Sequence, residues 1–126
     1  MKVTVSKRIG FYEIDSDYKL RLKPLLNVMQ EAAATHSDLA GCSTAALLAE
    51  GRAWVLHWMV LQVHRPPALG DELSVITWHK GSRGFRSYRD FEILAEEEKL
   101  VSAASLWLLI DTRRKRILKV PPDVAE

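Results

Sequence analysis

The stretch PLLNVMQEAAATHSDLAG, residues 24–41, decides how the chain is expected to fold. Five of its residues recur at alternating steps of four and three: Leu25, Met29, Ala32, His36 and Leu39. This is the spacing of one face of an α-helix. Pro24 suits the first turn, because its missing N–H would have no partner there, and Gly41 suits the end. The sequence therefore predicts one long helix with a buried face.

Strand patterns flank this helix on both sides. Residues 3–12 are rich in Val, Ile, Phe and Tyr and predict a first strand. STAALLAEG, residues 43–51, predicts a short second helix with Ser43 as its N-cap and Gly51 after its end. Four more strands are expected in succession: WVLHWMVLQVHRP at 54–66, ELSVITWHKG at 72–81, FRSYRDFEILAEE at 85–97 and LVSAASLWLLID at 100–111.

The order of these elements limits the fold class. The stretch 54–66 is apolar on both alternating faces, as expected of a central strand that is covered on two sides. Consecutive strands joined by short turns are expected to be antiparallel neighbours. One long helix on one face of such a sheet makes an α+β sandwich. The hotdog fold, in which an antiparallel five-stranded sheet wraps around a long central helix, is one candidate in this class.

Length and composition further limit the number of domains and the class of protein. A chain of 126 residues is expected to form a single domain, residues 1–126, with a core of its own. The single cysteine, Cys42, excludes an internal disulfide, and no Cys/His cluster has zinc spacing. The N-terminus lacks the apolar core of a signal peptide, and no apolar run approaches the roughly 20 residues that span a bilayer. We therefore expect a soluble cytoplasmic protein, with no membrane insertion and no metal or organic cofactor implied.

Three stretches carry a resemblance to a known family: YEIDSDYKLRLKPLLNVMQEAAATHSDLAG at 12–41, WVLHWMVLQVHRPPALGDELSVITWHKGSRGFRSYRDFEI at 54–93 and SAASLWLLIDTRRKRI at 102–117. Together they closely resemble the N-terminal half of acyl-acyl-carrier-protein thioesterases of bacteria and plants, over residues 8–122. The resemblance implies the hotdog fold. It also implies an enzyme that hydrolyses an acyl thioester of acyl carrier protein or coenzyme A and releases a fatty acid.

One turn departs from the family pattern. Family members usually carry two hotdog domains, and the second generally holds a catalytic Asn and His in a D-x-N-x-H turn. In the corresponding turn here, residues 15–19, Asp17 and Lys19 stand in those two places, so the two roles are not carried over. The chain is then either a stand-alone hotdog enzyme with other catalytic residues, or a non-catalytic acyl-binding or dimerisation domain that corresponds to the first half. A dehydratase acting on the same thioesters is a third hypothesis, which the family resemblance disfavours.

Two carboxylates are candidates for the chemistry. A thioesterase needs a carboxylate that activates water or attacks directly, and hydrogen-bond donors that hold the developing oxyanion. The resemblance makes Glu31 the preferred catalytic residue, because the family's second domain also has a helix glutamate at this distance from the turn. Asp90 is the second catalytic candidate, because the resemblance includes the pair Arg89–Asp90. A solvated helix residue and a structural ion pair are the non-catalytic interpretations.

Two helix residues are candidates for substrate binding. Asn27 lies four residues before Glu31 on the same stripe, where it can orient Glu31, hold a carbonyl or simply face solvent. His36 lies five residues after Glu31, about 140° around the helix, so one helix cannot bring these two side chains into a dyad. A buried, hydrogen-bonded His36 that anchors the helix to the sheet is the favoured interpretation, and a substrate-binding role stays open.

Large apolar and basic side chains supply the other binding candidates. Trp54 is expected to line an acyl tunnel with other large residues, unless all of them are core: Trp58, Trp78, Trp107, Met29 and Met59. Arg86 belongs to a basic group around two loops: Arg83, Arg113, Arg114, Lys115, Arg116 and Lys119. This group suits the acidic surface of a carrier protein or the phosphates of coenzyme A, with a solvated charge run as the alternative. Nucleic acid is not expected, since no stacking aromatics accompany the basic residues.

No nucleophile stands out in the sequence. The serines lack a G-x-S-x-G setting, and nothing near Cys42 signals a reactive thiol. His57 and His64 are expected in the core or at an edge, and His79 is expected to be exposed at the end of a strand. A lone hotdog sheet leaves one edge uncovered, so we expect a homodimer or higher homo-oligomer with joined sheets.

Overall fold

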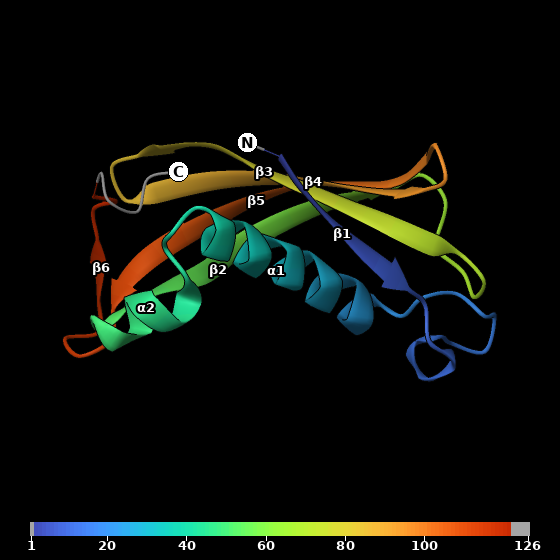
Figure 1. The fold of residues 1–126 in the computed structure, drawn as a ribbon, viewed down its shortest axis with the longest axis horizontal. Helices are drawn as coiled ribbons and strands as arrows, with labels where there is room; N and C mark the ends of the chain where they lie inside the picture. The colour runs from blue at the N-terminus through green and yellow to red at the C-terminus, as the bar shows by residue number, and fades with distance from the viewer. Residues whose placement is uncertain (1, 122–126) are drawn as a thin grey trace.

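The computed structural model describes residues 2–121 as one curled antiparallel sheet with two helices on its concave side (Figure 1). The elements follow in this order: β1 (Lys2–Arg8), a 3-10 turn (Phe11–Glu13), α1 (Leu22–Leu39), α2 (Thr44–Ala49), β2 (Arg52–Val63), β3 (Glu72–Arg83), β4 (Arg86–Ala95), β5 (Glu98–Asp111) and β6 (Arg116–Leu118). The strands pair in the order β1-β3-β4-β5-β2, and the short β6 pairs with β5. The predicted α+β hotdog arrangement is confirmed, with β6 as a strand beyond the five expected.

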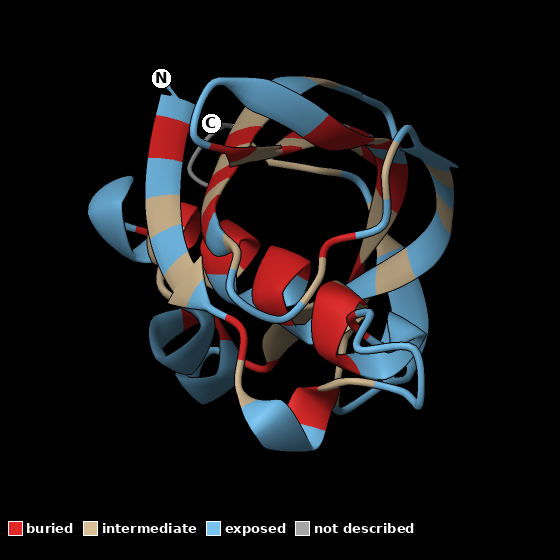
Figure 2. Cartoon of the chain, turned by 90° about the vertical axis from the view of Figure 1, so that its right-hand side faces the viewer, coloured by how far each residue is buried: buried red, intermediate tan, exposed pale blue. Residues whose placement is uncertain are grey.

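The sheet separates its side chains into an inner face that packs on α1 and an outer face. β4 shows this most clearly, because every second residue is buried: Ser87, Arg89, Phe91, Ile93 and Ala95. Side chains alternate between the two faces of a strand, so the intervening residues, Asp90 among them, point outward. Figure 2 shows the sheet curling around α1, with the buried positions on the inside.

α1 packs one face against the inner side of the sheet, as its periodicity predicts. It begins at Leu22, slightly before the predicted start at Pro24. Met29 and Ala32 are fully buried in the main core cluster, and the small side chain of Ala32 lets the sheet approach the helix axis closely. Leu39 was expected on this face, and that prediction is wrong: the residue is 67% exposed, because α1 ends there and the chain leaves the sheet.

β2 is the last strand of the sheet, which contradicts the prediction of a central strand. β4 and β5 lie between β2 and β3, so these two consecutive strands are not neighbours. The connection, residues 64–71, crosses the end of the sheet and is held by the segment before α1. Leu20 N–H donates to Pro67 O at 2.8 Å, and Leu69 N–H donates to Tyr18 O at 2.9 Å. The sequence of β2 is apolar on both faces, but in the structure its outer face is exposed to solvent. Val60 on that face is 62% exposed.

The first strand is shorter than predicted. β1 ends at Arg8, and the chain then turns, which leaves Phe11 and Tyr12 exposed. The carboxylate of Glu13 holds this turn by accepting a hydrogen bond from Gly10 N–H at 2.8 Å. Within residues 2–121, neither helix has both the length and the apolarity that a membrane span requires.

Candidate functional site

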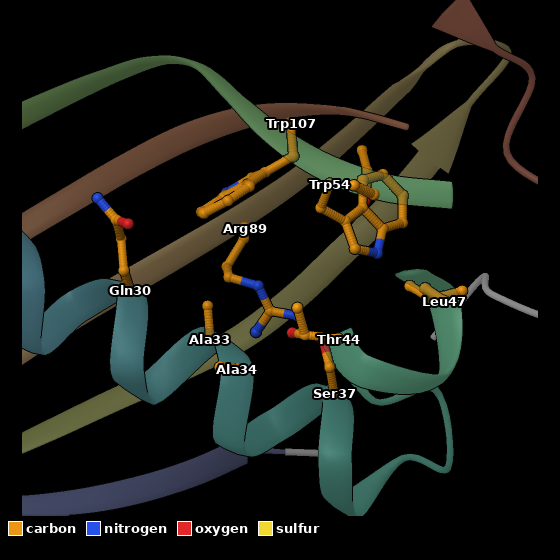
Figure 3. A pocket seen from close by; sticks show the side chains of 11 residues that line it. Gln30, Ala33, Ala34, Ser37, Thr44, Leu47, Trp54, Arg89 and Trp107 are labelled. Carbon is orange, nitrogen blue, oxygen red and sulfur yellow. The ribbon is translucent and has the colours of Figure 1, made fainter. Parts of the chain in front are cut away.

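A pocket of about 220 Å³ lies where α1, α2 and the inner face of the sheet meet (Figure 3). Its walls are formed by eleven residues: Gln30, Ala33, Ala34, Ser37, Thr44, Leu47, Ala53, Trp54, Ser87, Arg89 and Trp107. We call this space the inner pocket. It sits at the C-terminal end of α1, on the side of the molecule where α2 closes the sheet (Figure 1).

The elements place the lining residues through their regular periods. Ser87 and Arg89 are two residues apart on β4 and therefore share its inner face. Trp107 on β5 is paired with Ser87 and brings its indole to the same space. Opposite them, the small side chains of Ala33 and Ala34 on α1 leave room for the pocket.

α2 closes one end of the inner pocket. It begins after Ser43, whose hydroxyl accepts a hydrogen bond from Ala46 N–H at 3.1 Å, as predicted for an N-cap. Leu47 is buried on its inner side, in a second core cluster with Leu109. The short helix thus contributes an apolar end wall.

Arg89 places a guanidinium in this largely apolar space. The residue is only 6% exposed, and its Nη1 donates to His36 Nδ1 at 2.7 Å and to Thr77 Oγ1 at 3.2 Å. Nδ1 of His36 therefore accepts, which in a neutral imidazole puts the ring proton on Nε2. The contact joins α1 to β4, as expected for a buried His36 that anchors helix to sheet. Figure 3 shows the guanidinium directed toward Ser37 and Thr44.

A chain of hydrogen bonds fixes the opposite wall. Trp107 Nε1–H donates to Ser105 Oγ at 2.9 Å, and the Ser105 hydroxyl donates to Arg89 O at 2.7 Å. The hydroxyl of Ser105 therefore links the indole of Trp107 to the backbone carbonyl of Arg89 and fixes the orientation of the ring. These contacts make the pocket wall a rigid part of the sheet.

Three polar side chains meet at the sheet end of the inner pocket. Ser87 Oγ lies 2.8 Å from His79 Nε2, and Ser82 Oγ lies 3.2 Å from the same nitrogen. The expectation that His79 is exposed is wrong. The register of β3 against β4 shifts between His79 and Gly81, and the imidazole of His79 is half-buried beside Ser87 of β4. No local motif in the sequence indicates this contact, because it depends on how β3 pairs with β4; only the alternation of β4 marks Ser87 as inward-facing.

The two predicted carboxylates do not meet in one site. Glu31 is exposed on α1, next to the pocket residue Gln30 but not itself lining the pocket. Asp90 points from the outer face of the sheet, where its carboxylate lies 3.5 Å from Lys80 Nζ. Asn27 is exposed on the same helix as Glu31. The catalytic roles of Glu31 and Asp90, and the binding role of Asn27, stay predictions.

The other predicted binding residues are divided between the two sheet faces. Trp54 lines the inner pocket, whereas His36 does not line it and contacts only its lining residue Arg89. Arg86 lies on the outer face, beside a shallow hollow of about 700 Å³ that also contains Trp58. The expected tunnel residues thus do not line one space: Trp54 and Trp107 face the inner pocket, Trp58 and Trp78 face outward, and Met29 and Met59 pack in the core.

The turn at residues 15–19 lies at the opposite end of α1 from the inner pocket (Figure 1). Asp15 Oδ1 accepts from Asp17 N–H at 2.8 Å and from Lys19 N–H at 3.1 Å. The carboxylate of Asp15 thus organises the turn itself. Within residues 2–121 no three His, Cys, Asp or Glu side chains are grouped so that they could hold a metal ion.

Two carboxylates away from the pocket have shifted pKa values. Burial by itself raises the pKa of Glu13, but the hydrogen bonds from Lys7 Nζ and Gly10 N–H, with the charges of Lys7 and Arg21, outweigh burial and lower it. The pKa of Asp111 is lowered chiefly by the hydrogen bond from Arg114 N–H, which outweighs burial, and further by that from Arg113 N–H. Both groups hold turns.

Comparison with known proteins adds the following similarities. Residues 2–126 match the family described as acyl-ACP thioesterase N-terminal domain. The chain is 32% identical to a chloroplastic palmitoyl-acyl carrier protein thioesterase of Cuphea hookeriana over 92% of its own length and 30% of that protein. It is 33% identical to the protein of the same description from Gossypium hirsutum, again over 92% of this chain and 30% of the relative. The chain thus spans under a third of these relatives.

Solved structures show the same fold. The 12:0-ACP thioesterase of Umbellularia californica superposes with a TM-score of 0.83 and 27% identity, over 98% of this chain and 50% of that one. An acyl-ACP thioesterase from Bacteroides thetaiotaomicron gives a TM-score of 0.87 and 21% identity, over 93% of this chain and 49% of that one. A 1,4-dihydroxy-2-naphthoyl-CoA thioesterase from Synechocystis superposes with a TM-score of 0.85 and 18% identity, over 98% of this chain and 92% of that one. The fold therefore occurs both as half of a longer chain and as a nearly complete one.

Proposed function

The chain belongs to the acyl-ACP thioesterase family, whose N-terminal domain it matches over residues 2–126, and on that premise we propose that it acts in the hydrolysis of an acyl thioester. Water and an acyl thioester of acyl carrier protein or coenzyme A would give a fatty acid and the carrier thiol. The observation that carries the proposal is the inner pocket, an apolar space that contains the buried guanidinium of Arg89.

The lining of the inner pocket suits both parts of such a substrate. Trp54, Trp107 and Leu47 offer apolar surface to an acyl chain. Arg89 and Ser87 offer donors to the thioester carbonyl. Negative charge grows on that oxygen as the carbonyl carbon is attacked, so a fixed cation beside it stabilises the transition state more than the ground state.

The size of the inner pocket supports a site completed by a second hotdog unit. Its volume of about 220 Å³ is smaller than the roughly 300–1,000 Å³ typical of ligand pockets. Two lining residues, Ala53 and Trp54, lie on β2, the last strand of the sheet. A unit joined along β2 would extend the pocket, and we propose a homodimer with joined sheets as that arrangement.

Glu31 is the proposed base for water, with Asp90 as the second candidate. Glu31 follows the pocket residue Gln30 on α1, whereas Asp90 points from the opposite face of the sheet. A general base must come within hydrogen-bond reach of its proton, directly or through one water. Glu31 lies on the helix that lines the pocket, and this favours it over Asp90.

A thiol-release assay tests the activity and the base together. Purified protein receives acyl-acyl-carrier-protein or acyl-coenzyme A, and the released thiol is followed for wild type, Glu31→Gln and Asp90→Asn. We expect turnover in wild type, a loss of about 100-fold or more in Glu31→Gln, as for removal of a general base, and a small change in Asp90→Asn. Absence of turnover in wild type contradicts the enzymatic proposal. Full activity of Glu31→Gln removes Glu31 as the base.

A non-catalytic acyl-binding or dimerisation domain is the second candidate function. The turn at 15–19 favours it, because Asp17 and Lys19 replace the residues that resemblance would make catalytic. Acyl-thioester binding without thiol release in the same assay would support this function. The proposed compartment is the cytoplasm, although the curated plant relatives are described as chloroplastic.

A further inference from the structure

The outer face of the sheet carries a hollow of its own, separate from the inner pocket. Its volume is about 700 Å³, within the roughly 300–1,000 Å³ typical of ligand sites. Residues of β2, β4, β5, β6 and the turn between β3 and β4 line it. We call this space the outer hollow. The proposed hydrolysis does not use it.

The local structure of two strands forms the outer hollow at this place. The register of β2 against β5 shifts between Leu56 and Trp58, so His57 is an extra residue on β2. Such a bulge bends a strand and redirects its side chains, and both His57 and Trp58 line the hollow. On the other side of β5, Val120 N–H donates to Gly84 O at 2.9 Å, which joins the segment after β6 to the β3–β4 turn. The hollow therefore lies between a bulge and two joined segments.

Large apolar side chains line the outer hollow and are accessible to solvent. Trp58, Phe85 and Ile117 are each more than 40% exposed. Leu106 also lines the hollow and is buried, so the apolar surface continues from the exposed side chains into the sheet. A concave apolar patch of this kind is typical of a binding site. Joining two sheets along the edge of β2 pairs backbone groups and leaves this face of the sheet open.

The polar part of the outer hollow is cationic. Arg86 lines it, and Arg83 is paired directly opposite Arg86 across the turn. Side chains of directly opposite residues lie on the same face of a sheet, where two like charges destabilise each other. Both arginines are exposed, neither forms an ion pair within residues 2–121, and none of the described residues that line the hollow is acidic. A bound anion would relieve this repulsion.

These features together fit a ligand with an apolar body and one anionic head. A carboxylate accepts two parallel hydrogen bonds from a guanidinium, and this contact is stronger than a neutral hydrogen bond. The aromatic and aliphatic wall suits a hydrocarbon chain. A second copy of this chain fits less well, because a two-fold interface on this face would bring the arginines of both copies together. A fatty acid has the required chemistry.

We propose that the outer hollow binds a free fatty acid, with its carboxylate on Arg86 and Arg83 and its chain on the aromatic wall; this rests on the proposed hydrolysis, which releases such an acid. The site lies back to back with the inner pocket. On β5, Leu106 and Leu108 line the outer hollow, whereas Trp107 between them lines the inner pocket. The protein can therefore hold a released acid without blocking the inner pocket.

The test measures binding directly and does not depend on turnover. The purified chain is titrated with dodecanoate and with dodecyltrimethylammonium, which has the same chain and a cationic head, both below their micelle-forming concentrations, and the heat of binding is recorded. Bromododecanoate locates the site, because bromine quenches tryptophan fluorescence on contact. The variants are Arg86→Gln and Trp58→Phe. Lys80→Gln is the control, since Lys80 is an exposed cation that pairs with Asp90 on the outer face and does not line the hollow.

We expect saturable binding of dodecanoate to wild type and to Lys80→Gln, with dissociation constants that differ by less than about twofold. Arg86→Gln should bind dodecanoate about tenfold or more weakly, because a charge-assisted contact is lost. Dodecyltrimethylammonium should bind wild type at least as weakly as dodecanoate binds that variant. Bromododecanoate should quench wild type and lose most of this effect in Trp58→Phe, because Trp58 is the tryptophan among the described residues that line the hollow. Circular dichroism establishes that each variant is folded.

Four results would overturn the inference: no saturable binding to wild type, equal affinity for the two amphiphiles, unchanged affinity in Arg86→Gln, or quenching that persists in full in Trp58→Phe. A change of molecular mass in Arg86→Gln, measured by light scattering, would identify a second copy as the occupant and also overturn it. Thiol release from acyl-coenzyme A is measured on the same samples. Thiol release without binding in the outer hollow overturns this inference while the proposed function survives. Binding there without thiol release upholds the site and overturns hydrolysis, and absence of both overturns both.

Discussion

Arg89 connects three parts of the molecule through one side chain. Its Nη1 donates to His36 on α1 and to Thr77 on β3, while its own strand is β4. A buried cation is costly unless its donors are satisfied, so these contacts offset the cost of desolvation. At the scale of a single residue, the same side chain therefore serves both the pocket and the attachment of α1 to the sheet.

Arg89→Met tests how much the contacts of the Arg89 guanidinium contribute to the stability of the fold. The substitution keeps an unbranched apolar side chain but leaves His36 Nδ1 without this donor, so we expect the free energy of unfolding to fall by about 2–3 kcal/mol. Chemical denaturation measures the change. Arg86→Met, at an exposed position of the same strand, is the control and should change stability by less than about 0.5 kcal/mol. Equal losses in both variants would contradict the assignment.

Glu13 predicts a pH dependence of stability. Its pKa is lower in the folded state than in the unfolded chain, because the hydrogen bonds from Lys7 and Gly10 and nearby positive charge outweigh burial. Its contribution is therefore present above the pKa of the unfolded chain and is lost as the pH falls through the lower folded pKa. Urea unfolding of wild type and Glu13→Gln should differ most at pH 7, with the difference shrinking toward pH 3.

The exposed Glu97→Gln variant is the control for that series. It removes a carboxylate from a surface turn without removing a buried contact. Its difference from wild type should be small at every pH. If the Glu13→Gln difference stays constant across the acidic range, Glu13 does not stabilise the fold through its ionised form.

At the scale of elements, the β4–β5 hairpin has a backbone position that its residue does not favour. Ala95 pairs with Glu98, so Glu96 and Glu97 form the connection, and Glu96 has φ +57°. This left-handed conformation costs a non-glycine residue roughly 1 kcal/mol, whereas glycine adopts it readily. Glu96→Gly should therefore raise the free energy of unfolding by about 0.5–1 kcal/mol.

Glu97→Gly gives the matched comparison. Glu97 is not among the positions with positive φ, so glycine there gains nothing in the folded state and adds freedom to the unfolded chain. It should lower stability. Thermal unfolding of the two variants side by side measures whether each one is more or less stable than wild type. A destabilised Glu96→Gly would overturn this interpretation of the turn.

Elements with a local signal could be predicted from the sequence, and long-range pairings could not. The period of α1 and the N-cap Ser43 of α2 are contained in short stretches, and both helices are confirmed. The place of β2 in the sheet depends on the path of residues 64–71, which no local pattern determines. His79 and Ser87 meet because β3 pairs with β4 in a register that places His79 opposite Arg89, so their contact likewise becomes visible only in the folded chain.

At the scale of the whole molecule, the two sheet ends differ in chemistry. β1 carries charged residues, among them Lys2, Lys7 and Arg8, which protect a strand edge from pairing. β2 instead presents exposed apolar side chains on its outer face: Val55, Trp58 and Val60. This asymmetry supports association through β2 rather than β1.

Val60→Lys should weaken that association. Light scattering coupled to size exclusion should give twice the chain mass of 14.3 kDa for wild type and the single mass for Val60→Lys at the same concentration. A lysine at an edge disfavours strand pairing and cannot be buried there without cost. Thr4→Lys, at an exposed position of β1, is the control and should leave the mass unchanged. A wild-type monomer at high concentration would remove the dimer proposal.

The position of β2 beside β5 has a consequence for synthesis on the ribosome. Val55 pairs with Leu108, so β2 leaves the exit tunnel long before the strand that completes its ladder has been made. Pairings between distant parts of a chain form slowly, and apolar strands that are still unpaired are prone to aggregate. β3, β4 and β5 are joined by short hairpins and can form first, which leaves β2 to dock last. We therefore expect the nascent chain to depend on chaperones until β5 has emerged.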